Sequence, residues 1–156
     1  MIEKDLNKFI KKTENKFTNL LRNVCLELSY KICERTGVDT GYLLGTYRIG
    51  INRPGVMPSF KPGPSSWIKE GNTFVKDKSI EAKNKERAFE FTLSRVLSTV
   101  SRLNYTDSFY FDTIVNYADM VEYIGWNRTP PYRMFGRTII DFQSIVIEEA
   151  NKVKNV

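Results

Sequence analysis

The chain has no histidine among its 156 residues. Histidine is the commonest general base and the commonest ligand for transition metals, so its absence removes the usual starting point for acid–base and metal chemistry. A structural zinc site is disfavoured as well, because two cysteines alone do not supply four ligands. We therefore expect no metal, no cofactor and no enzymatic activity.

Cysteine is scarce, and its placement excludes an internal disulfide. Cys25 and Cys33 fall in one predicted helix. A rise of ~1.5 Å per residue puts them roughly 12 Å apart, which is too far for a disulfide. We interpret them as two buried free thiols in a reducing compartment.

Long apolar runs are also missing. No run approaches the ~20 residues that a membrane-spanning helix needs. The first residues, MIEKDLNKFIKK, mix acids with bases and show no secretory signal pattern. Charge is abundant instead: 24 Lys and Arg against 18 Asp and Glu give a formal net charge of +6. This balance favours an acidic partner, either nucleic acid or the acidic face of a protein.

Hydrophobic periodicity predicts one long helix at the N-terminus, within residues 1–36 and ending before Gly37. Apolar positions recur at steps of three and four without an intervening proline or glycine. The stripe expected to be buried contains Ile2, Leu6, Phe9, Thr13, Phe17, Leu20, Val24 and Leu28. The opposite face carries Lys4, Lys8, Lys11, Lys12 and Lys16. These lysines form either a solvated surface or an interaction surface, and a helix this long could project from the body.

The remainder predicts a small antiparallel sheet packed by two further helices, so the fold class is α+β in a single domain, 1–156. A strand is expected at 47–51 and another within 108–117, because apolar residues alternate there. A helix is expected at 80–103, a short helical turn at 118–123 and a last helix at 132–153. The stripe expected to be buried on the last helix contains Phe135, Ile139, Phe142, Val146, Ala150 and Val153.

A long loop, 54–80, follows the first strand and is rich in Pro, Gly, Ser and Lys, with a short strand at 73–75. Its apolar residues are Met57, Phe60 and Trp67. These side chains could dock the loop on a partner, or they could pin it to its own core.

No catalytic constellation stands out. The segment DTGYLLG is similar to the Asp-Thr-Gly of aspartic proteases, but that chemistry needs two carboxylates sharing a proton. We interpret Asp39 or Thr40 as the cap of a short helical turn. Asp119 and Glu122 are interpreted as a solvated edge, or as ion-pair partners of Arg128 or Arg133.

Aromatic and basic residues interleave before and within the start of the last helix. The cluster comprises Trp126, Arg128, Tyr132, Arg133, Phe135 and Arg137. Such a mixture can stack bases and hold phosphates. It can equally form a hot spot between proteins, or simply pack the last helix.

The order of these segments resembles a family of tailed-phage proteins described as neck, head–tail joining, minor tail or tail-completion proteins. The match covers about 38–153 and rests on DTGYLLGTYRIGIN and on TIVNYADMVEYIGWNRTPPYRMFGRTIIDFQSIVIEEA. The motif positions are Asp39, Thr40, Gly41, Leu44, Asn116, Tyr117, Ala118, Glu122 and Gly125. The chain departs from the family where Ile124 separates Tyr123 from Gly125, and where TPPYR replaces an Ala-Pro-Ala-Gly stretch.

The resemblance implies a structural virion protein in the neck or tail, assembled in the host cytoplasm. It implies a ring, expected to be a hexamer, that contacts connector, terminator or tail-tube proteins while genomic DNA passes without sequence-specific binding. An alternative within this class is a tail terminator that caps the tube. An alternative of another class is a basic protein that binds nucleic acid without sequence preference and releases it as salt rises.

In this reading, the loop from Gly125 to Tyr132 makes subunit contacts. Gly125 gives the backbone freedom, and Pro130 and Pro131 stiffen a loop that displays Trp126 and Arg128. Asn116 and Asp119 are expected to fix the exit from the preceding strand. Because tightly bound DNA would stall in a channel, the lysine face of the first helix is expected to point away from it, towards an acidic neighbouring ring.

Overall fold

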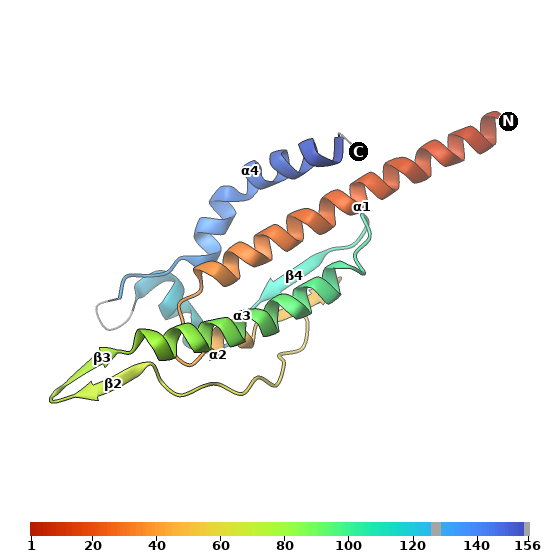
Figure 1. The fold of residues 1–156 in the computed structure, drawn as a ribbon. Helices are drawn as coiled ribbons and strands as arrows, with labels where there is room; N and C mark the ends of the chain where they lie inside the picture. The colour runs from red at the N-terminus through yellow and green to blue at the C-terminus, as the bar shows by residue number, and fades with distance from the viewer. Residues whose placement is uncertain (126–128, 155–156) are drawn as a thin grey trace.

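A computed structural model describes residues 1–125 and 129–154. The fold is α+β, as the sequence predicts, with long helices and short antiparallel strands (Figure 1). The elements in chain order are α1 (Ile2–Arg35), α2 (Tyr42–Gly45), β1 (Arg48–Ile51), β2 (Trp67–Glu70), β3 (Thr73–Lys76), α3 (Lys78–Val100), β4 (Phe109–Asp112), the π-helical turn η1 (Met120–Ile124) and α4 (Met134–Lys154).

The described strands form two separate two-stranded sheets rather than one. The first pairs β1 with β4 antiparallel, with Ile49 opposite Phe111. The alternating pattern predicts both strands, but not that they pair with each other. The second is a β2–β3 hairpin inside the segment expected to be a long loop. Its strands are joined at Gly71, which has a positive φ of 64°, a signal typical of tight hairpin turns. The irregular part of the predicted loop therefore ends before Trp67.

The C-terminal half of α1 is the spine against which α3 and α4 lie (Figure 1). Arg35 donates hydrogen bonds to Thr138 at 3.2 Å and to Asp141 at 2.5 Å, which fixes the register of α4 on α1. The same guanidinium lowers the pKa of the Asp141 carboxyl, so the pair stays ionised at neutral pH. On the α3 side, Arg22 donates to the Leu103 carbonyl at 2.8 Å.

Tyr47 lies at the centre of the core and is fully buried. Its ring contacts Phe111 and Phe135, with centroids 4.8 and 5.9 Å away, and its hydroxyl is 2.8 Å from the Thr36 hydroxyl. Burial raises the pKa of Tyr47, so the phenol is neutral at any pH at which the protein folds. The surrounding cluster joins α1, α2, α3 and α4 through Ile32, Cys33, Val38, Leu43, Leu44, Ala88, Ala118 and Met134.

The apolar stripe of α1 is buried only in its second half. Val24 is buried, whereas Ile2, Phe9 and Phe17 are 85%, 67% and 55% exposed. The expectation of a continuous buried stripe is therefore wrong for the first half. The reason is geometric: α1 continues past the C-terminus of α4 and the end of α3 (Figure 1). The suggestion that this helix projects is confirmed.

The buried face of α4 also differs from the one expected. Met134, Thr138, Ile145 and Glu149 face the core, whereas Ile139 and Phe142 are exposed. This helix is apolar on two faces, so periodicity alone could not choose between them. The Arg35 contacts with Thr138 and Asp141 decide the choice. On α3, Val96 and Val100 are buried, whereas Ala82 is exposed.

The two cysteines are buried and free, as the spacing predicts. Burial raises the pKa of Cys25 to about 11 and that of Cys33 to about 12, from an ordinary value of 9.0. Both thiols are therefore protonated at neutral pH. No helix among the described residues is long and apolar enough to cross a bilayer.

We expect neither thiol to react with Ellman's reagent in the native protein at pH 8, because the thiolate is the attacking species and both groups are enclosed. A pKa raised from 9.0 to about 11 lowers the thiolate fraction of Cys25 about 100-fold on its own. Two equivalents should react once urea unfolds the chain. Rapid reaction of either thiol without urea would contradict the burial of this face of α1.

Candidate functional site

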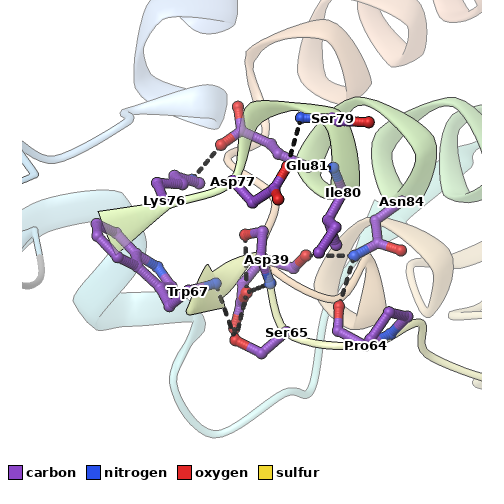
Figure 2. Close-up of polar contacts among 11 residues, drawn as sticks. Asp39, Pro64, Ser65, Trp67, Lys76, Asp77, Ser79, Ile80, Glu81 and Asn84 are labelled. Atoms are coloured by element: carbon purple, nitrogen blue, oxygen red, sulfur yellow. Dashed lines mark hydrogen bonds and ion pairs between the residues drawn. The ribbon is translucent and has the colours of Figure 1, made fainter. Parts of the chain in front are cut away.

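The Asp-Thr-Gly motif precedes α2, and its Asp39 carboxylate binds the end of the loop that leads to β2. That carboxylate accepts hydrogen bonds from the Ser66 amide at 2.6 Å, the Ser66 hydroxyl at 2.9 Å and the Ser65 hydroxyl at 3.0 Å (Figure 2). The expectation that Asp39 caps the short helix is therefore wrong. Thr40 takes a role of that kind, because its hydroxyl accepts from the Tyr42 amide at 3.3 Å.

The neighbours of Asp39 complete this clamp through their backbone. The Asn84 side chain donates to the carbonyls of Asp39 and Pro64, at 2.7 and 2.8 Å, from α3 (Figure 2). The Gly63 amide donates to the Thr40 carbonyl at 2.8 Å. Gly41 has a φ of 84°, and a Cβ there would press on Asn84 and Ala88, so the position requires glycine. Leu44, the last motif residue, is fully buried in the core.

The clamp also holds the base of the hairpin. The Asp77 amide donates to the Ser66 carbonyl at 2.6 Å. Ser66 precedes β2 and Asp77 follows β3, so this hydrogen bond joins the two ends of the hairpin. Asp77 caps α3 through the amides of Ser79 and Ile80, and Lys76 pairs with Glu81 at 2.6 Å (Figure 2). The hairpin is thus fixed at its base and points away from the body (Figure 1).

Of the three apolar residues of the loop, Phe60 packs on the protein's own core. The Phe60 ring lies 5.1 Å from that of Phe91, with the Arg87 guanidinium over it. Phe60 also fills the space above Gly45, where a Cβ would overlap the ring. Met57 is half-buried, and Trp67 is half-buried beneath the Lys76 ammonium at 5.5 Å. Of the two roles left open for Phe60, pinning the loop is the one that the structure shows.

The second motif caps the last helix. Glu122 is buried, and its carboxylate accepts from the amides of Phe135 and Gly136 at 3.2 and 2.8 Å. A negative charge there complements unpaired amides at a helix N-terminus. The prediction that Glu122 belongs to a solvated edge is therefore wrong. Asp119 is exposed and makes no side-chain cap of η1, and Asn116 lies at the surface, so the role expected of these two residues at the strand exit is not seen.

The remaining motif residues serve packing and chain direction. Ala118 is buried and Tyr117 is half-buried against the core. Gly125 has a φ of 86°, and its amide donates to the Met120 carbonyl at 2.8 Å. A Cβ at Gly125 would overlap the Thr129 carbonyl, so the expected need for glycine is confirmed.

The residues expected to display a contact loop divide into two groups. Tyr132 is half-buried, packs on the core and lies against Gly37, while Arg133 is exposed with a φ of 49°. The contacts of Tyr132 are therefore with the protein's own core. Trp126 and Arg128 lie outside the residues that the structure describes.

The two motifs meet around one cavity of about 380 Å³, although about 75 residues separate them in sequence. Gly41 and Tyr42 line one side, and Tyr117, Val121 and Gly125 line the other. Burial, with Tyr42 and Asp39 nearby, raises the pKa of Tyr117 to about 12, so its hydroxyl stays neutral. No group of three or more Cys, Asp or Glu residues among those described could hold a metal ion.

Uncovered apolar side chains gather on the projecting elements instead. The first is the N-terminal part of α1, where Lys4, Lys8 and Lys11 are exposed on the opposite face. The second is the hairpin, where Ile68, Phe74 and Val75 are 42%, 65% and 42% exposed. These surfaces are the strongest candidates for a functional site, and they suit binding rather than catalysis.

No protein-family model, curated protein or solved structure matches the chain. The functional argument therefore rests on the residues and on the geometry described above.

Replacing Asp39 by Ala should loosen the loop from residue 53 to residue 66. Three hydrogen bonds to one carboxylate are lost, which we expect to cost about 1–3 kcal/mol of local stability. Chymotrypsin cleavage after Phe60 should then become about tenfold faster or more. Asp39→Asn, which keeps one acceptor oxygen, should fall between wild type and Asp39→Ala. Equal cleavage rates for all three proteins would contradict the clamp.

Replacing Glu122 by Ala should lower the free energy of unfolding by about 1–3 kcal/mol, because two helix amides lose their buried acceptor. Asp119→Ala, in the same turn, is the matched control and should stay within about 0.5 kcal/mol of wild type. Urea unfolding followed by circular dichroism measures both. A larger effect at Asp119 than at Glu122 would overturn the assignment of the cap.

Proposed function

We propose that this chain is a structural subunit of a tailed-phage virion that forms or joins a ring at the head–tail interface. The observation that carries the proposal is the projecting half of α1, where Ile2, Leu6 and Phe9 of the apolar stripe are 85%, 54% and 67% exposed. An uncovered stripe of this kind marks a surface for another protein. The phage context comes from the resemblance of the two motifs.

The motifs support an assembly role because they build a support and no reaction centre. Asp39 ties down the hairpin base, and Glu122 sets the start of α4. Both carboxylates accept hydrogen bonds from backbone amides and so hold the chain in place. The outcome is a body from which a helix and a hairpin project at well-separated places (Figure 1).

A second candidate function follows from charge. Lys4, Lys8, Lys11 and Lys12 lie along one exposed side of α1, and Lys16 continues the row. A row of lysines can follow a phosphate backbone, and binding of this kind weakens steeply as salt rises. In the ring proposal the same row faces an acidic protein neighbour, with DNA passing elsewhere.

Electron microscopy of the phage that encodes this chain, with the gene stopped early, tests the proposal. We expect filled heads and normal-length tails that remain separate. Tails of uncontrolled length would assign the terminator role instead. Infectious, intact particles would overturn the structural role and direct attention to salt-dependent DNA binding by the purified protein.

A further inference from the structure

The N-terminal part of α1, residues 2–17, is termed here the α1 tip. Its apolar side chains fall on one side of the helix and continue the stripe that is buried further along. The exposed fractions are 85% for Ile2, 54% for Leu6, 67% for Phe9, 45% for Ile10 and 55% for Phe17. The lysine row occupies the opposite side, so the tip is an amphipathic helix without a partner.

A second uncovered apolar surface lies on α4, facing away from α1, and is termed the α4 outer face. It consists of Ile139, Ile140, Phe142 and Ile147, with exposed fractions of 71%, 81%, 50% and 54%. The inner face of the same helix packs on α1 through Met134, Thr138 and Ile145. Helix α4 therefore has room for a second helix on its outer side.

The two surfaces cannot meet within one molecule. Arg35 near the end of α1 pairs with Asp141 near the start of α4, so the helices run antiparallel and α4 covers only the second half of α1. The tip continues beyond α4 (Figure 1). Helix α1 contains no proline or glycine at which it could fold back. Among the residues that the structure describes, none covers either surface, so another molecule is needed to bury them.

We propose that the α1 tip of one copy of this chain packs on the α4 outer face of the next copy. With about 200 Å² for each large side chain, the two faces together offer roughly 1,100 Å² of exposed apolar surface. A stable interface buries about 1,200–2,000 Å² in total, so the flanking polar groups need add little. Helices crossing in this way bury both surfaces in one contact.

Charge favours this pairing over two tips packing on each other. The tip carries five lysines, at positions 4, 8, 11, 12 and 16, against the acids Glu3, Asp5 and Glu14, a formal excess of two positive charges. Helix α4 balances three basic residues, Arg137, Lys152 and Lys154, against Asp141, Glu148 and Glu149. A tip–tip pair would join two positive helices and leave the α4 outer face in water, whereas a tip–α4 pair does neither.

The contact joins two different surfaces, so each copy donates a tip to one neighbour and accepts a tip from another. Such heterologous contacts close into a ring or continue as a filament, according to the rotation between copies. The biological meaning of this inference rests on the proposed ring function. The contact itself is a property of the purified chain and can be tested without a phage.

The test uses the full chain and sedimentation velocity across a concentration series. Wild type should form oligomers that grow with concentration. Phe9→Asp disables the tip, and Ile140→Asp disables the α4 outer face. Each variant should be monomeric, because the contact would bury an unpaired charge and raise the Kd about 100-fold or more. An equimolar mixture should give one-to-one heterodimers and nothing larger, because only one pair of intact surfaces remains.

Matched controls separate the contact from folding and from general stickiness. Phe9 and Ile140 are exposed, so both variants should keep the wild-type circular dichroism spectrum and unfolding midpoint. Val56→Asp makes the same kind of change at an 86% exposed loop residue and should assemble like wild type. Asn15→Asp adds a negative charge to the lysine side of the tip and should also assemble.

Three results would overturn the proposal. The first is a wild-type chain that stays monomeric at every concentration, and the second is an Ile140→Asp protein that assembles as well as wild type. The third is a mixture of the two variants that stays monomeric. If any of these occurs while the stopped gene still leaves heads and tails apart, the virion function stands and another surface joins the copies. If the tip–α4 contact holds but the phage is unaffected, the proposed function fails and the contact remains.

Discussion

The C-terminal half of α1 is the surface on which α3, α4 and the β1–β4 sheet pack. Helix α4 lies on it through Arg35, and the end of α3 lies on it through Arg22. The β1–β4 sheet enters the core through Ile49 and Phe111, next to α1 residues such as Cys25. Because both partner helices are shorter than α1, the body can cover only part of it. The exposed half follows from this mismatch in length.

A half-buried carboxylate, a buried carboxylate and a buried asparagine connect the loops to this framework. Asp39 and Asn84 hold the long loop, and Glu122 holds the first turn of α4. Each pairs with backbone groups that regular secondary structure leaves unsatisfied, which is the condition for burying polar groups without a large penalty. No buried side-chain nitrogen or oxygen within residues 1–125 and 129–154 lacks a partner. Asp39 and Glu122, two residues of the phage-like motifs, are therefore explained by the backbone groups that they bind.

Local signals were sufficient for the elements and insufficient for their partners. The bounds of α1, the presence of strands at β1 and β4, and the positive φ at Gly125 follow from periodicity and turn chemistry, which are local. The buried face of α4 depends on where Arg35 lies, and the roles of Asp39 and Glu122 depend on residues 13 to 27 positions away. Spacing along the chain carries no information on such contacts. The β2–β3 hairpin was missed in part because its strands are short and exposed, so no buried alternation marks them.

The projecting half of α1 also makes one part of the molecule able to unfold locally, while the rest unfolds only as a whole. Residues 1–12 are exposed throughout, so their helical hydrogen bonds receive no support from tertiary packing. An isolated helix shorter than about 12–15 residues is marginal in water. The first turns therefore open with a free energy near zero, while amides around Cys33 open only when the whole domain unfolds. Along this single helix, amide exchange should be rapid near Ile2 and as slow as global unfolding near Cys33. A bound neighbour would extend the protected region towards Ile2.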